Sequence, residues 1–166
     1  MTTATSSILY IDLSVPCRLP FTGAENMSPG MSGIVKLEKR GEDLYLDNNK
    51  FYLFLPEKQA GEKLVFGYDL CKEIEIRGGN TRAKILDALC SDPTFWPESW
   101  KKGLDGKPLY VSFWGDTFRD PSNNEMYVRY GSWYHNRRTV SHYYYWLGSL
   151  FGRERPVASI KISKAA

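Results

Sequence analysis

The sequence lacks the signatures that identify the common classes of enzyme and metal protein. It has no Gly-x-Ser-x-Gly, no P-loop, no dinucleotide-binding glycine pattern and no Cys-x-x-Cys pair. Its cysteines, Cys17, Cys71 and Cys90, are odd in number and widely spaced. We therefore expect no disulfide framework, no metal and no cofactor, and we interpret the cysteines as buried thiols in a reducing compartment.

Long hydrophobic runs are also missing. The N-terminal MTTATSSILYIDLSVP has no basic start, and Asp12 interrupts its apolar residues. This is not the pattern of a signal peptide, and no segment approaches the length of a membrane span. The sequence thus predicts a cytoplasmic protein without a membrane partner. A chain of 166 residues fits one domain, which we expect to span residues 1–166.

Acidic residues are absent from one long segment, residues 127–151. This segment contains nine aromatic residues, three arginines and both histidines of the chain. The formal net charge of the whole chain is only +3, but after Glu125 seven basic residues face one acidic residue, Glu154. An anionic partner would therefore meet the C-terminal half.

The first half of the chain reads mostly as strands. Ser7–Val15, Ile34–Lys39, Leu44–Asp47 and Phe51–Leu55 are rich in β-forming residues. Asp47-Asn48-Asn49-Lys50 joins the last two and predicts a hairpin. Leu64–Leu70 and Lys72–Arg77 are predicted as further strands, with Ile74 and Ile76 on one face.

The second half mixes helices with strands. After Gly78-Gly79-Asn80-Thr81, the apolar residues Ile85, Leu86, Leu89 and Cys90 share one helical face. Between Thr139 and Phe151 the apolar and aromatic residues recur at spacings of three to four, which predicts a second helix, although Tyr143–Trp146 has high β propensity. Strands are predicted at 109–114, 126–130 and 157–162, with a polar loop at 116–124. The predicted fold is α+β: a single domain with a mostly antiparallel curved sheet or small barrel and two main helices.

The acid-free segment is the first candidate site. If Met126, Val128 and Tyr130 face the core, Tyr127 and Arg129 begin an exposed strip that Arg137 and Arg138 continue. Rings that stack on bases and arginines that hold phosphates predict binding of single-stranded or structured nucleic acid. The alternative is that the rings are core and the arginines form a solvated face. The candidate residues for nucleic acid or another partner are Tyr127, Arg129, Trp133, Tyr134, His135, Arg137, Arg138 and His142.

The turn RGGNTRAK is a second candidate. Its two glycines and the following helix N-terminus suggest a phosphate seat made of Arg77, Gly78, Gly79, Asn80, Arg82 and Lys84. The alternative is an ordinary strand-to-helix turn, capped by Asn80 or Thr81, with the basic side chains in solvent.

The two histidines allow a third hypothesis. His135 and His142, with nearby arginines, could act as general base and acid of a metal-independent phosphodiesterase. The alternative is that they are ordinary surface or hydrogen-bonded histidines. The leading hypothesis is a non-catalytic nucleic-acid-binding protein. The runner-up is a protein–protein interaction module, such as an inhibitor or adaptor of a nucleic-acid enzyme, because Tyr, Trp and Arg also anchor protein interfaces.

Overall fold

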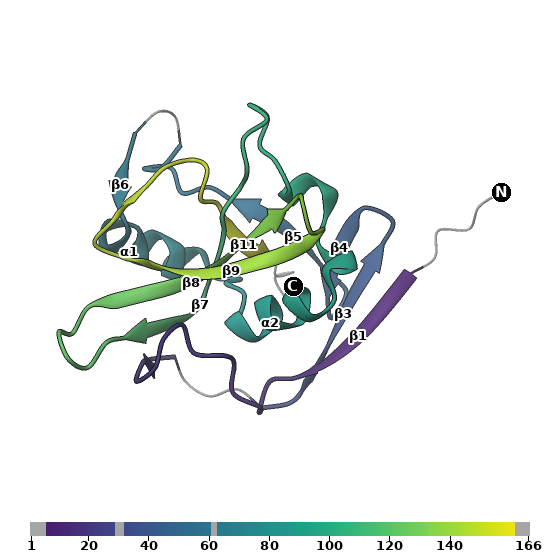
Figure 1. Ribbon diagram of the computed structural model, residues 1–166, viewed down its shortest axis with the longest axis horizontal. Helices are drawn as coiled ribbons and strands as arrows, with labels where there is room; N and C mark the ends of the chain where they lie inside the picture. Colours follow the sequence, from purple (N-terminus) through teal and green to yellow (C-terminus); the bar gives the residue numbers. More distant parts are fainter. Residues whose placement is uncertain (1–5, 29–31, 61–62, 162–166) are drawn as a thin grey trace.

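The computed structural model describes residues 6–28, 32–60 and 63–161. Within these ranges the chain forms two α-helices, two short 3-10 helices and eleven strands, arranged as in Figure 1. In chain order they are β1 (Ser6–Asp12), β2 (Glu25–Asn26), β3 (Ile34–Arg40), β4 (Asp43–Leu46), β5 (Asn49–Phe54), β6 (Val65–Phe66), α1 (Gly67–Arg77), α2 (Ala83–Ser91), η1 (Pro93–Phe95), η2 (Glu98–Trp100), β7 (Val111–Arg119), β8 (Met126–Tyr134), β9 (Thr139–Trp146), β10 (Leu150–Phe151) and β11 (Val157–Ile160).

Most strands belong to one sheet. Its order is β1-β3-β4-β5-β11-β7-β8-β9, and β2 pairs with β7 beside this path. Neighbours are antiparallel except β11 and β7, which are parallel. In this order β1 and β9 are edges, so the sheet is open and curved rather than a closed barrel (Figure 1). The predicted α+β class is confirmed, in its curved-sheet form.

The predicted strands of the first half are largely confirmed. β1, β3, β4 and β5 form an antiparallel meander. The hairpin between β4 and β5 turns at Asp47 and Asn48, whose φ angles are 46° and 67°. Asp and Asn tolerate this left-handed backbone better than most residues, which is why the sequence revealed the turn.

The two strands predicted between residues 64 and 77 are wrong. Only Val65–Phe66 is a strand, and α1 follows from Gly67. Leu70 and Ile74 are four residues apart and both buried, whereas Ile76 is 76% exposed. Ile74 and Ile76 therefore do not share a face, because two residues along a helix rotate the side chain by roughly 200°. The alternation of Ile and Glu in the sequence was misleading.

The helix predicted after the glycine turn is confirmed as α2. Ile85, Leu86 and Leu89 are fully buried, as their spacing predicts. The cap is different: the N-cap residue is Arg82, not Asn80 or Thr81. The first backbone N–H, that of Ala83, donates instead to a carboxylate oxygen of Asp116, at 2.7 Å.

The helix predicted between Thr139 and Phe151 is also wrong. Thr139–Trp146 is strand β9, which pairs residue for residue with β8. Tyr143 and Tyr144 are exposed while Val140 and Leu147 are buried, so the residues spaced by three and four do not form one apolar stripe. The β propensity of the tyrosine run indicated the observed structure correctly. The polar loop predicted at 116–124 begins later, because β7 continues to Arg119.

The central strands are covered on both faces. Phe113 on β7 packs in a cluster with Leu86 and Leu89 of α2, whereas the next residue, Trp114, packs with Leu70 and Ile74 of α1. Consecutive strand residues point to opposite faces, so α1 and α2 lie on opposite sides of β7 and β8 (Figure 1). This arrangement decides which side chains of the β8–β9 hairpin remain available to a ligand.

Candidate functional site

The β8–β9 hairpin divides the acid-free segment between two faces. Its register runs from Tyr127 opposite Trp146 to Tyr134 opposite Thr139, without a bulge. Tyr127, Arg129, Gly131 and Trp133 therefore share the face toward α2. Val128 and Tyr130 belong to the other face, the first of them packed on the α1 side.

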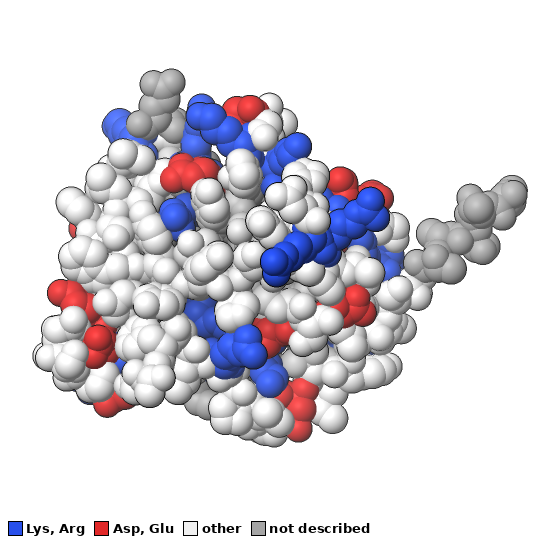
Figure 2. Space-filling model, viewed as in Figure 1, with Lys and Arg blue, Asp and Glu red and all other residues white. Residues whose placement is uncertain are grey.

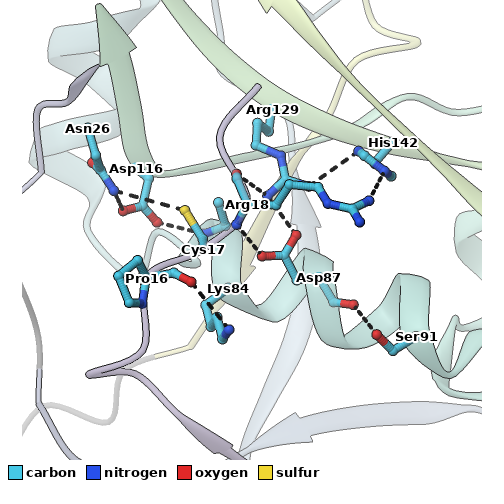
Figure 3. Close-up of polar contacts among 11 residues, drawn as sticks. Pro16, Cys17, Arg18, Asn26, Lys84, Asp87, Ser91, Asp116, Arg129 and His142 are labelled. Carbon is cyan, nitrogen blue, oxygen red and sulfur yellow. Dashed lines mark hydrogen bonds and ion pairs between the residues drawn. The ribbon is translucent and has the colours of Figure 1, made fainter. Parts of the chain in front are cut away.

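Arg129 is buried on the α2 face, at 1% exposed. Its Nη1 lies 2.7 Å from a carboxylate oxygen of Asp87 on α2 and donates to the backbone oxygen of Arg18 at 3.0 Å. Asp87 also accepts a hydrogen bond of 2.7 Å from the backbone N–H of Arg18. Figure 3 shows these groups joining β8, α2 and the loop after β1. The predicted exposure of Arg129 is wrong, because α2 and this loop cover it.

His142 lies between two arginines on the same face (Figure 3). Its Nε2 is 3.0 Å from Nη1 of Arg18, and its Nδ1 is 3.4 Å from Nη2 of Arg129. A neutral imidazole has one acceptor nitrogen and a guanidinium has only donors, so one contact at a time is a hydrogen bond. Burial, and then the charges of Arg129 and Arg18, lower the pKa of His142. The ring is therefore held in its neutral form.

The two histidines are not brought together. His135 is exposed in the turn between β8 and β9, beyond the Tyr134–Thr139 pair, whereas His142 is opposite Gly131. His142 is three residues along the strand from Thr139, which is about 10 Å of extended chain. This arrangement gives no support to a paired acid and base acting on one phosphate.

Trp133 and Tyr127 are half-buried on the α2 face. Tyr127 packs edge-on against Phe21 and Tyr144, with ring centroids 5.2 and 5.6 Å away. The ammonium group of Lys101 lies 4.0 Å from the centroid of the Trp133 ring. These two rings therefore have protein partners already.

The opposite, outer face of the hairpin has an unusual composition. From Tyr130 on β8 and from Thr139 on β9, every side chain that alternation places on this face has a hydroxyl group. They are Tyr130, Ser132, Tyr134, Thr139, Ser141, Tyr143 and Tyr145. Tyr143 is 57% exposed and Tyr134 is also exposed. We call this set, together with Tyr110 just before β7, the hydroxyl face.

Arg155 lies within the hydroxyl face. Its Cζ is 3.5 Å from the ring centroid of Tyr145 and 4.8 Å from those of Tyr110 and Tyr130. Tyr130 also packs on Tyr143, with centroids 5.8 Å apart. Burial raises the pKa of the Tyr130 hydroxyl, so this group remains a neutral donor and acceptor. Three tyrosines from three adjacent chain segments therefore surround one guanidinium, and Tyr143 packs on one of them.

A groove of about 770 Å³ is lined by residues that precede Tyr110 and Arg155 in the sequence. It is lined by Leu55, the 103–109 loop and residues 153–154, and it includes the basic side chains of Lys107 and Arg153. Glu154 and Asp105 line it as well. Arg137 and Arg138 are exposed at the far end of the hairpin.

Charge is distributed unevenly around the hairpin. In Figure 2 a broad uncharged band follows the hairpin, and Lys and Arg lie where it turns and above and below it, with Asp and Glu among them. Asp and Glu appear at the opposite end, near the β7–β8 turn, which contains Asp120 and Glu125. The tyrosine-rich surface is thus neutral itself, and side chains of both charge signs border it.

The residues of the predicted phosphate seat do not converge on an empty anion site. Arg82 lies 2.9 Å from a carboxylate oxygen of Asp116, the group that also accepts from Ala83 at the start of α2. A carboxylate of the protein thus takes the place expected for a phosphate. Lys84 donates to the backbone oxygen of Pro16, and Arg77 stacks over Phe54.

The turn itself has a structural explanation. Gly78 and Gly79 have φ angles of 72° and 69°. A Cβ on Gly79 would lie 2.3 Å from the backbone oxygen of Ile160, because the turn packs against β11. Asn80 forms a bridge with Ser159 and donates to the backbone oxygen of Ile74. The glycines allow this close approach of two backbones.

Sequence reasoning missed Tyr110, Tyr143, Tyr145 and Arg155 as members of one surface. A signal was present: Tyr-x-Ser-x-Tyr at 130–134 and Thr-x-Ser-x-Tyr-x-Tyr at 139–145 repeat hydroxyl residues with a period of two. Interpreting 139–151 as a helix hid it, because helical spacing disperses these residues around the axis.

The three cysteines are unpaired and half-buried. Burial raises the pKa of all three thiols, that of Cys90 to about 11, so none is an activated nucleophile. Among the described residues, no group of three or more His, Cys, Asp and Glu side chains could hold a metal ion. In the same ranges, no helix combines the length and the apolar character needed to cross a membrane.

Comparison with known proteins gives no assignment: no family model, no curated protein and no solved structure matches this chain.

Proposed function

We propose that the hydroxyl face of the β8–β9 hairpin binds single-stranded or structured nucleic acid, without catalysis. One observation carries this proposal: tyrosines from three neighbouring chain segments surround Arg155, beside a groove that includes Lys107 and Arg153. Aromatic rings on a sheet with cations around them are a common means of binding a single strand.

The chemistry of each part fits this ligand. Tyrosine rings offer faces on which bases stack, at about 1 to 3 kcal/mol per base. The hydroxyl groups of Tyr, Ser and Thr donate to and accept from base edges and sugars. The Arg155 guanidinium is held by three rings, so little conformational entropy is lost when it binds a phosphate. Arg137, Arg138 and Arg153 add cationic groups beside this face.

The proposed surface differs from the strip expected from the sequence. Tyr134, Arg137 and Arg138 remain in or beside it, and His135 lies in the same turn. Arg129 and His142 belong to the opposite face, where they join α2 to the loop after β1. Tyr127 and Trp133 also face that side. Within this proposal their contribution is to the stability of the hairpin.

A protein partner is the second candidate, and the composition of the hydroxyl face favours it. Tyr and Ser dominate antibody paratopes, because Tyr offers a large rigid contact area and Ser an adaptable hydrogen bond. As an inhibitor or adaptor, the protein would use the same tyrosines. In either case the three unpaired thiols fit the reducing cytoplasm that we expect as its location.

The two adjacent tyrosines Tyr143 and Tyr144 provide the test. They lie on opposite faces and are 57% and 45% exposed. We expect Tyr143→Ala to weaken binding of a labelled 20-nucleotide single-stranded DNA or RNA by about 5-fold to 150-fold, the value of one base stack. Tyr144→Ala is the matched control and should leave the affinity unchanged. Fluorescence anisotropy measures both.

Salt dependence separates the two candidates. If Arg137 and Arg138 each contact a phosphate, Arg137→Ala/Arg138→Ala should reduce the slope of log K against log salt by about 1.4, at about 0.7 per contact for a single strand. Absence of oligonucleotide binding at 50 mM salt would overturn the nucleic-acid proposal. Tyr143-dependent binding of a purified protein partner, with little salt dependence, would then support the second candidate.

A further inference from the structure

The edge strand β1 lies at the other end of the sheet order from β9 and has backbone N–H and C=O groups that no described strand pairs with. Among the described strands, β1 pairs only with β3. Leu13 continues this register by donating to the backbone oxygen of Gly33, at 2.9 Å. In an antiparallel pair every second residue bonds to its partner. Odd-numbered residues of β1 therefore bond to β3, and the backbone groups of Ile8, Tyr10 and Asp12 point away from it.

Among the described residues, this edge lacks most of the usual protection against added strands, and Asp12 at its end is its one charged residue. β1 is seven residues long, contains neither Lys nor Pro, and pairs with β3 without a bulge. Tyr10 is 69% exposed and Ile8 is also exposed. Proteins usually interrupt such an edge, because it is a template for another strand.

A groove of about 500 Å³ runs between this edge and α2. Residues 9–12 and Val15 line one side, and Lys84, Asp87, Ala88, Ser91 and Asp92 line the other. The spacing of three to four places the latter along one face of the helix. A groove bounded by a strand edge and a helix is the geometry in which peptides bind by strand addition: the edge supplies backbone hydrogen bonds, and the helix supplies side-chain contacts. The small side chain of Ala88 leaves room for an apolar group.

The charges of the groove indicate the kind of peptide. Asp12 and Asp92 line it, against one cation, Lys84, whereas the carboxylate of Asp87 is already paired with Arg129. Hydrogen bonds from Ser14 lower the pKa of Asp12, so this carboxylate is ionised at neutral pH. Asp92 is the C-cap of α2, where the helix dipole also favours a positive charge. The rest of the protein is basic, and an acidic groove is therefore selective for cationic segments.

We propose that the groove between β1 and α2 binds an extended peptide segment of a partner protein, which adds as a strand to β1. Its backbone bonds to Ile8 and Tyr10, an apolar side chain packs over Ala88, and a lysine or arginine lies near Asp92. This site is independent of the hydroxyl face and of the ligand proposed for it.

The experiment is selection of random ten-residue peptides displayed on phage against the full chain, followed by affinity measurement with synthetic peptides. We expect selected sequences that combine apolar residues with Lys or Arg. Hydrogen exchange should show the Ile8 and Tyr10 amides becoming protected when the peptide binds. Peptide affinities should be the same in Tyr143→Ala, which separates this site from the hydroxyl face.

Variants locate the peptide. Tyr10→Pro removes one outward N–H, and Tyr10→Ala keeps it; the first should weaken binding by about tenfold relative to the second. Ala88→Arg should abolish peptide binding by filling the groove. It tests the position of the peptide even if Tyr10→Pro fails to fold. In Asp92→Asn the asparagine can still cap the next turn but lacks the negative charge. This variant should therefore weaken the binding of basic peptides only.

Three results would overturn the proposal. One is a selection that yields no peptide whose affinity falls in Ala88→Arg. Another is peptide binding that leaves the Ile8 and Tyr10 amides unprotected. The third is protection of these amides in the protein alone, in a dimer detected by sedimentation, which would make a second copy the occupant of the edge.

Discussion

The two faces of the β8–β9 hairpin come from one segment of the sequence and differ in burial. Toward α2 the hairpin presents Arg129, Gly131 and Val140, all buried, and Arg129 is in an ion pair with Asp87. On the outer face Tyr130, Ser132 and Tyr143 remain partly or largely open to solvent. Arginine occurs on both sides, fully buried at position 129 and surrounded by tyrosine rings at position 155.

This difference shows that composition alone cannot separate a binding surface from a core. A segment without acidic residues looked uniformly suited to an anionic ligand. The strand period of two instead divided it into one face that joins the hairpin to α2 and one that is more open to solvent. What distinguishes them is the element packed on top.

The strongest test of the comparison is removal of each arginine. Arg129→Met leaves Asp87 half-buried without its main partner, and we expect it to lower the free energy of unfolding by about 3 to 5 kcal/mol. Arg155→Met removes the cation–π contacts of a half-buried guanidinium that has no carboxylate partner among the described residues, at a cost of about 1 to 2 kcal/mol. Urea denaturation measures both variants.

A double variant sharpens this test. Arg129→Met/Asp87→Leu removes both charges, and it should recover much of the stability lost in the single variant, because two apolar groups replace a buried pair at little cost. Equal losses in Arg129→Met and Arg155→Met would contradict the assigned difference between the faces.

Substitutions at the adjacent small residues Gly131 and Ser132 should give a smaller difference in stability between the two faces. A Cβ on Gly131 would lie 2.7 Å from Cδ1 of Leu86 and 3.1 Å from the Trp96 ring. Gly131→Ala should therefore destabilise the protein by about 1 to 3 kcal/mol through overpacking against α2. Ser132→Ala, on the outer face, should change stability by less than about 0.5 kcal/mol. Thermal unfolding followed by circular dichroism compares them; similar melting temperatures for the two would count against tight packing on the α2 face.

The smallest expected effect is a pH dependence of stability. The pKa of His142 is lowered in the folded state, mainly by burial, so the unfolded chain takes up a proton more readily. Its contribution to stability is complete above its usual pKa of about 6.5 and is lost as pH falls through the lower folded value. His142→Gln should flatten the dependence of the urea midpoint on pH between 7.5 and 5. His135→Gln, in the exposed turn, is the control and should leave the wild-type dependence unchanged.

Local sequence patterns were sufficient where local interactions dominate. The Asp-Asn turn of the β4–β5 hairpin and the apolar stripe of α2 were predicted, because turn chemistry and helical periodicity act over a few residues. α1 and β9 were not predicted. Their sequences fit both periods over a short window, and the outcome depended on partners distant in the chain: Val128 and Phe151 for α1, and the whole of β8 for β9.

The sequence by itself determined the α+β class, the excess of basic residues in the C-terminal half and the presence of an aromatic, acid-free segment near its end. Tertiary structure alone decided that the buried Arg129 and the half-buried His142 belong to one polar cluster and that Arg155 lies among the tyrosines of the opposite face. It also placed Asp116 at the start of α2, where a phosphate was expected. The physical reason is that burial and pairing depend on contacts between residues far apart in the chain, while composition and period are properties of neighbours.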